Sequence, residues 1–211
     1  MIMLDSRYNV NTSLNTWQST IGNYIAQITG EYSYIEDKIV MNHLTGTTKG
    51  IYLTTPDLPT GHYPFSIYLK ARTLGCTNYH LVNIGSDYTT PGASLFMMTW
   101  ASRARAGVNS AKYWSNATIN NTSFEILYTF DGISRTPKLY SVVNDVITEA
   151  TFSYTSENMA ALMHIVNTTG IVLGGDNTAE TSCELYEIEK FAFIKKVCTS
   201  EDLKLLMKYG Q

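Results

Sequence analysis

The chain has 211 residues, of which 44% are hydrophobic, 12% are aromatic and only 16% are charged. This length and the 15 tyrosines favour one large all-β domain over residues 1–211. The net charge of −3, with no basic cluster larger than Arg103/Arg105 or Lys195/Lys196, excludes a typical nucleic-acid-binding protein. No run of about 18 apolar residues is present, so we expect no membrane insertion.

The beginning of the chain, Met1–Ser6, has neither the basic region nor the continuous apolar region of a secretory signal. We therefore expect that the protein is made without a signal peptide on this chain. Two origins stay open: synthesis in a cytoplasm, or excision from a longer secreted protein.

Short segments with a period of two alternate with turn residues along the chain, a pattern typical of antiparallel sheets. In Phe65–Ala71 every second residue is apolar, which predicts a strand with one packed face. Leu95–Trp100 is apolar on both faces and predicts a central strand. Thr54–Gly61 and Ser86–Gly92 are rich in turn formers and predict loops.

One helix is predicted near the C-terminus, from about Ser200 to Tyr209. Thr199 or Ser200 caps its first turn, and two acidic residues follow the cap. Leu203 and Leu206 share one face of this helix, so we expect them to pack on the sheets.

Several motifs occur in a fixed order. In the first half they are Trp17–Asn23, Pro64–Lys70 and Val82–Ser86; in the last third they are Tyr128–Gly132, Lys138–Tyr140, Asn144–Asp145, Val172–Gly175, Glu187–Ile194 and Thr199–Leu203. This order resembles the laminin-G-like, concanavalin-A-like jelly roll over roughly residues 14 to 208, although the Asp of the family's first motif is absent. The resemblance implies an all-β fold: a two-sheet antiparallel jelly-roll sandwich with a short C-terminal helix. We expect Phe191 and Phe193 to point into its core.

Glycoside hydrolases and polysaccharide lyases are also built on this fold, so a catalytic function needs to be considered. Retaining glycosidases place two carboxylates about 5 to 5.5 Å apart across the sugar bond. Glu184–Glu189 is similar to their E-x-D-x-x-E strand at its first and last positions, but Tyr186 replaces the middle Asp. We predict that Glu184 and Glu189 lie in solvent and that the chain has no catalytic residue. The scattered histidines and the absence of a G-x-S-x-G motif argue against a nucleophilic triad as well.

The three cysteines, Cys76, Cys183 and Cys198, are spaced neither like a CxxC pair nor like a zinc module. Because three cysteines cannot all pair within one chain and free cysteines are usually buried, we expect reduced and mostly buried thiols.

No cofactor is predicted other than calcium, which many laminin-G-like modules hold at the rim of the sandwich. The resemblance implies Asp87 and Asp176 as candidate ligands, because each follows a predicted strand end in a turn. Neither has a second acidic residue close in sequence, and an Asp in a turn usually caps its own backbone. That purely structural role is the alternative.

The preferred ligand region is the polar stretch from Ser102 to Asn121, which is flanked by Trp100 and contains Tyr113 and Trp114. Aromatic faces suit the C–H surfaces of sugars, and the amides and hydroxyls of this stretch suit sugar hydroxyls. We expect the binding surface on loops around Trp114, because a sandwich carries its specificity on its connections. Further ligand candidates are Tyr88 and Asn177. The alternative is that Trp100 belongs to the core and that Tyr113 and Trp114 anchor a long connection.

Two classes of function remain. The first is a non-catalytic carbohydrate- or receptor-binding module, with a glycan or a cell-surface receptor as its partner. The alternative is a structural, self-assembling virion subunit without a ligand, and a glycan-cleaving enzyme ranks below both. A weakly charged, Asn-, Thr- and Tyr-rich chain without a signal is typical of phage or viral particles. We therefore expect a tail-fibre or capsid-decoration protein on a virion or extracellular surface, as a homo-oligomer or attached to a particle scaffold.

Overall fold

The computed structural model describes residues 1–45, 50–54, 58, 63–76, 79–85, 94–100, 103–108, 111–119, 121–132, 137–150, 152–153, 170–174 and 182–208. The described strands are β1 (Ile2–Asp5), β2 (Val10–Asn11), β3 (Thr16–Gln18), β4 (Ile25–Thr29), β5 (Tyr32–Ile35), β6 (Lys38–Thr45), β7 (Gly50–Leu53), β8 (Phe65–Leu74), β9 (His80–Gly85), β10 (Ser94–Trp100), β11 (Arg103–Val108), β12 (Ala111–Thr118), β13 (Ser123–Phe130), β14 (Lys138–Val143), β15 (Val146–Glu149), β16 (Phe152–Ser153), β17 (Ile171–Leu173) and β18 (Ser182–Ile194). The described helix is α1 (Ser200–Lys208).

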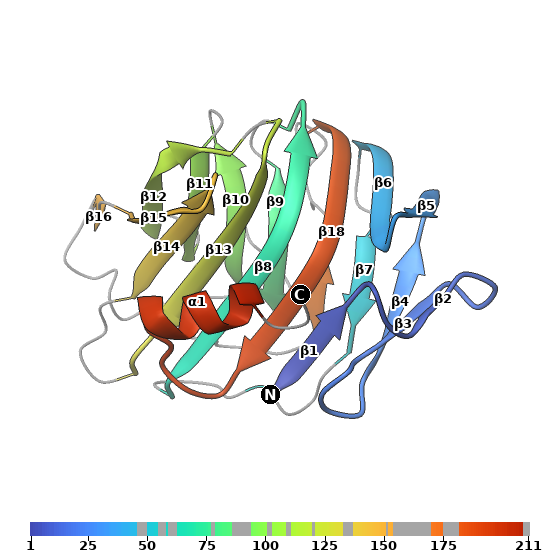
Figure 1. The fold of residues 1–211 in the computed structure, drawn as a ribbon, viewed down its shortest axis with the longest axis horizontal. Helices are drawn as coiled ribbons and strands as arrows, with labels where there is room; N and C mark the ends of the chain where they lie inside the picture. The colour runs from blue at the N-terminus through green and yellow to red at the C-terminus, as the bar shows by residue number, and fades with distance from the viewer. Residues whose placement is uncertain are drawn as a thin grey trace.

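These strands form two sheets stacked face to face (Figure 1). The eight-stranded sheet has the order β15-β14-β13-β8-β18-β6-β5, with β1 also paired to β18. The ten-stranded sheet has the order β16-β12-β11-β10-β9-β17-β7-β4-β3-β2. All pairings among the described strands are antiparallel. The predicted two-sheet antiparallel sandwich with a short C-terminal helix is therefore confirmed.

The core fills the space between the two sheets. In β8, the alternate residues from Phe65 to Ala71 lie in this core, as their spacing predicts. Phe191 and Phe193 are both fully buried there, which confirms the prediction for them. The Phe193 ring stacks on Phe65, with ring centroids 5.6 Å apart.

Helix α1 packs on the outer face of the eight-stranded sheet (Figure 1). Thr199 caps it as predicted: its hydroxyl accepts a hydrogen bond from the Asp202 amide at 3.2 Å, and the Asp202 carboxylate accepts one from the Thr199 amide at 2.8 Å. Leu203 is fully buried among residues of the sheet, and Leu206 packs at the border of the same cluster. Within the described ranges no helix has the length and apolar character needed to cross a membrane.

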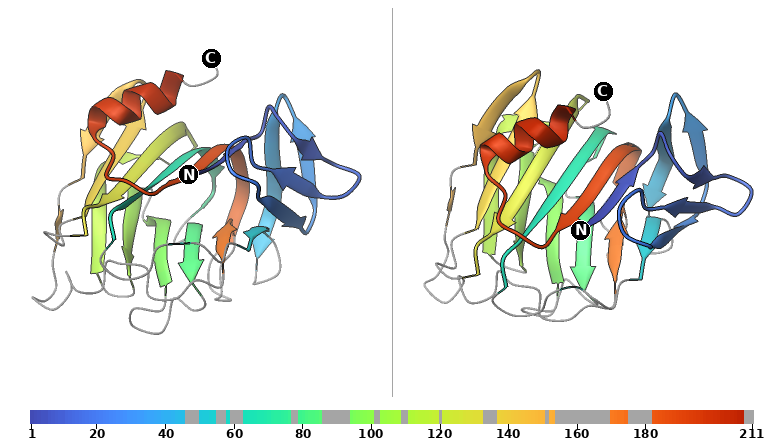
Figure 2. Two further views of the ribbon diagram at one scale, coloured as in Figure 1. Left: turned by 90° about the horizontal axis from the view of Figure 1, so that it is seen from below. Right: turned by 60° about the horizontal axis from the view of Figure 1, so that its bottom comes forward.

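The N-terminal hairpin of β2 and β3 lies at the opposite end of the molecule from α1 (Figure 2). It is held to the core by Trp17, which is fully buried and donates its indole N–H to the carbonyl of Asp5 at 3.2 Å. Ala26 is paired with Trp17 on the neighbouring strand β4 and is equally buried. The hairpin is thus a firmly attached end of the ten-stranded sheet.

The prediction that all three cysteines are reduced is wrong. Cys76 and Cys183 form a disulfide, and Cys198 is a buried free cysteine. The pairing arises from the fold, because Cys76 follows the end of β8 and Cys183 lies near the start of the antiparallel strand β18. The two cysteines are therefore neighbours in space although they are 107 residues apart in the sequence.

Candidate functional site

The structure describes some of the predicted ligand residues but not others. Tyr88 and Asn177, and the calcium candidates Asp87 and Asp176, lie outside the described residues. Trp100 lies at the end of β10, and Tyr113 and Trp114 lie in β12. Their backbone positions are therefore known.

The prediction that Trp114 lies on a loop is wrong. The polar stretch after Trp100 forms two paired antiparallel strands, β11 and β12. Its Asn and Ser residues resemble the composition of a loop. Arg103 and Arg105 nevertheless alternate with Ala104 and Ala106, and this period of two is the sequence signal of a strand. Ala104 and Ala106 are fully buried in the core, as such alternation requires.

The strand register separates the aromatic residues into two groups, because residues directly paired across antiparallel strands lie on the same face of a sheet. Tyr113 is paired with Ala106, on the core side. Trp114 is paired with Arg105, and Trp100 is paired with Arg103, two positions along the same strand. The register thus places the positions of Trp100 and Trp114 on the outer face of the ten-stranded sheet, two strands apart.

Three polar residues share this outer face with them. Arg105, His80 and Asn83 are 3%, 3% and 5% exposed, although they lie outside the core between the sheets. His80 is paired with Met98, which is in turn paired with Arg105, so the two are two strands apart on one face. Burial lowers the pKa of the Arg105 guanidinium to about 9. No described group donates a hydrogen bond to the side-chain oxygen of Asn83.

Buried polar groups have stronger hydrogen bonds and stronger electrostatic interactions than groups in water. Two tryptophan positions and three buried polar residues, a guanidinium, an imidazole and an amide, therefore lie on one face of the sheet. We name the outer face over β9, β10, β11 and β12 the aromatic face.

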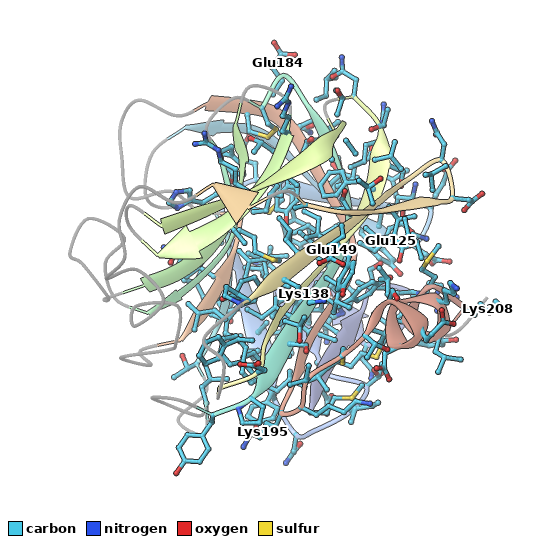
Figure 3. The ribbon with its side chains drawn as sticks, turned by 90° about the vertical axis from the view of Figure 1, so that its left-hand side faces the viewer. Glu125, Lys138, Glu149, Glu184, Lys195 and Lys208 are labelled. Carbon is cyan, nitrogen blue, oxygen red and sulfur yellow. A yellow bond between two sulfur atoms is a disulfide. The ribbon has the colours of Figure 1, made fainter. Side chains whose placement is uncertain are left out.

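The carboxylates of β18 do not form a catalytic pair. Glu184 is exposed, as predicted, and lies at one end of the sandwich, far from Glu125 (Figure 3). The prediction that Glu189 lies in solvent is wrong. Its side chain is 18% exposed, and its carboxylate lies 2.7 Å from the ammonium of Lys70 and 3.6 Å from that of Lys38. A bulge between Ile188 and Lys190 turns Glu189 toward these lysines.

Glu187 is engaged in the same network, with its carboxylate 2.8 Å from the guanidinium of Arg72. A glycosidase needs two acids facing each other across a sugar site, whereas these acids face basic residues on the neighbouring strands. The network therefore joins β6, β8 and β18 and has a structural role.

The ion-paired Glu187 and the exposed Glu184 allow a matched test of this structural role. Glu187→Gln is expected to lower the free energy of unfolding by about 1 kcal/mol, because it weakens a charge-assisted hydrogen bond at a partly buried position. Glu184→Gln is expected to leave stability unchanged. Equilibrium urea denaturation measures both, and equal effects of the two substitutions would contradict the assignment.

Buried ionisable groups next to this network have shifted pKa values. Burial raises the pKa of Glu125, which accepts a hydrogen bond from the Tyr68 hydroxyl at 2.5 Å. Burial also lowers the pKa of Lys190. Both residues lie on the outer face of the eight-stranded sheet, so they belong to the structural network and not to the aromatic face.

A metal centre is not built from the described residues, among which no group of three His, Cys, Asp or Glu side chains is close enough to hold an ion. Calcium at Asp87 and Asp176 stays a prediction, since both fall outside the described ranges.

Fold and register together define an antiparallel β-sandwich with a polar, tryptophan-containing face on one sheet. No protein-family model matches the chain, and no curated protein matches it by sequence. Solved structures do resemble it: the binding domain of botulinum neurotoxin DC in complex with rat synaptotagmin II has a TM-score of 0.69 at 12% identity, over 100% of this chain and 51% of that chain.

Two further botulinum neurotoxin structures are similar in the same way. The serotype G binding domain has a TM-score of 0.67 at 13% identity, over 99% of this chain and 50% of that chain. The serotype D ligand binding domain in complex with N-acetylneuraminic acid has a TM-score of 0.66 at 12% identity, over 100% of this chain and 50% of that chain. The chain spans about half the length of these proteins, and at this identity the likeness establishes the fold alone.

Proposed function

We propose that this chain is a non-catalytic module that binds a glycan or a cell-surface receptor, and that its sandwich is a laminin-G-like, concanavalin-A-like jelly roll. The observation that carries the proposal is the strand register, which places the backbone positions of Trp100 and Trp114 on the outer face that also holds Arg105. The similar structures add support, because they are binding domains, one in complex with synaptotagmin II and one with N-acetylneuraminic acid.

The chemistry of the aromatic face supports a glycan as the ligand. An indole ring offers an apolar surface to the C–H groups of a sugar, while an amide and a guanidinium bind hydroxyls or a carboxylate.

The setting that we propose is a virion or another extracellular surface. The Cys76–Cys183 disulfide supports an oxidising environment for the mature protein. On a particle, many weak sites of roughly millimolar affinity, about 4 kcal/mol each, add up to firm attachment. Homo-oligomers, a particle scaffold and a rim calcium at Asp87 and Asp176 are parts of this proposal.

Screening the protein against an array of neutral and sialylated glycans tests the proposal, followed by Trp114→Ala. Stacking of a base on an aromatic side chain is worth about 1 to 3 kcal/mol, and we take the same scale for a sugar. Trp114→Ala is therefore expected to weaken binding about tenfold or more with an almost unchanged melting temperature. Tyr113→Ala is the matched control, because its pairing with the buried Ala106 predicts a lower melting temperature.

Two outcomes would contradict the proposal. If Trp114→Ala unfolds the protein, Trp114 is a packing residue; if binding is unchanged, the binding surface lies elsewhere. A trimer or larger assembly in a solution-mass measurement, together with no glycan bound on the array, would favour the structural virion subunit instead.

A further inference from the structure

A hollow lies at the end of the ten-stranded sheet away from the aromatic face. It has a volume of about 500 Å³ and is formed by the β2–β3 hairpin and the start of β4. Its lining residues are Asn9, Val10, Asn11, Thr12, Leu14, Thr16, Gln18 and Ile25. We name it the amide hollow.

The strand register puts the amide hollow on the same outer face as the aromatic face. Asn11 is paired with Thr16, and Gln18 is paired with Ile25, whereas the intervening Trp17 is buried in the core. Counted along the sheet from β3 to β12, the two regions are seven strand spacings apart. At about 4.8 Å per spacing this is roughly 30 to 35 Å.

The lining has the chemistry of a site for a neutral, hydroxyl-rich ligand. None of its side chains is ionisable, so it offers no counter-charge to a phosphate, a carboxylate or an ammonium group. It offers amides and hydroxyls instead, together with two strongly exposed aliphatic side chains, Leu14 at 66% and Ile25 at 62%. Sugars combine hydroxyls with apolar C–H faces, which these groups complement.

The Asn11 amide is held in place, and both Asn11 and Gln18 keep donors available to a ligand. The Asn11 side-chain oxygen accepts hydrogen bonds from the amides of Ser13 and Leu14, both at 3.1 Å, and its NH₂ group is left to donate. The Gln18 side chain makes no hydrogen bond to a described residue, although its backbone amide is fixed by the Asn9 carbonyl at 3.1 Å. The buried Trp17 between them fixes the backbone of the hollow.

We propose that the amide hollow is a sugar-binding subsite for a neutral hexose unit. This inference rests on the proposed glycan-binding function for its ligand class, but it does not require Trp114 to be a ligand residue. Where a glycan is long enough to reach both regions, the second contact becomes intramolecular and the affinity rises with chain length.

The test is a titration of ¹⁵N-labelled full-length protein with cellohexaose, maltohexaose and mannohexaose at up to about 10 mM, a range set by the roughly millimolar affinity of single sites. Side-chain NH₂ signals of Asn11 and Gln18 are expected to shift with at least one of these probes. Gln18→Ala and Ile25→Ser should each weaken that binding about fivefold or more. Ile35→Ser is the matched control, because Ile35 is a similarly exposed strand residue, at 55%, on the other sheet.

The variants separate this inference from the proposed function. Lost binding in Gln18→Ala and Ile25→Ser but not in Trp114→Ala supports the amide hollow and overturns the aromatic face. The reverse pattern overturns the amide hollow and leaves the proposed function standing. No shift with any of the three neutral probes, or an equal loss in Ile35→Ser, would also overturn the amide hollow.

Discussion

Replacing both Cys76 and Cys183 by serine is expected to lower the free energy of unfolding by about 3 to 5 kcal/mol. The disulfide joins residues that are 107 positions apart in the sequence. A cross-link lowers the conformational entropy of the unfolded chain, and it does so more for a longer loop, so the stabilisation approaches the upper end of the usual range. Equilibrium urea denaturation of the oxidised protein and of the double variant measures the difference. Thiol titration of the denatured oxidised protein should find one reactive cysteine, Cys198.

Reduction provides the control for this experiment. Dithiothreitol should destabilise the wild-type protein to about the level of the double variant and should leave the double variant itself unchanged. Equal stability of the oxidised and reduced wild-type proteins would contradict the role that we assign to the disulfide.

Phe193→Ala is expected to cost about 3 to 5 kcal/mol, because it removes a fully buried ring and leaves a cavity between the sheets. The stacking contact with Phe65 is lost at the same time. Urea denaturation monitored by circular dichroism gives the magnitude. Val146→Ala, at a strand position that is 63% exposed, should change stability by less than about 0.5 kcal/mol. A loss below about 1 kcal/mol for Phe193→Ala would mean that this strand is misplaced.

Local pattern was sufficient for much of the architecture. Alternation in Phe65–Ala71 predicts a strand with one core face, and the structure has β8 there with those residues in the core. The Thr199 cap followed by acidic residues predicts the start of α1. These predictions succeed because strand periodicity and helix capping depend on residues within a few positions of one another.

The candidate site was only partly predictable. Trp100 and Trp114 stand out in the sequence as candidates, but their Asn- and Ser-rich surroundings resemble a loop, and the strands β11 and β12 form because each pairs with a neighbour. The residue composition of a segment indicates its preference for turns, whereas the formation of a strand also depends on the neighbouring strand with which the segment pairs. The common face of Trp114 and Arg105 follows from the register and not from either residue.

By itself the sequence determined the core face of β8, the C-terminal helix and the core positions of Phe191 and Phe193, because local periodicity encodes which side of an element is apolar. Only the tertiary structure decided that Cys76 meets Cys183, that Glu189 meets Lys70 and that the amide hollow shares a sheet face with Trp114. Each of these relations joins residues far apart in the chain, and it exists only because crossovers and register set the order of the strands in each sheet.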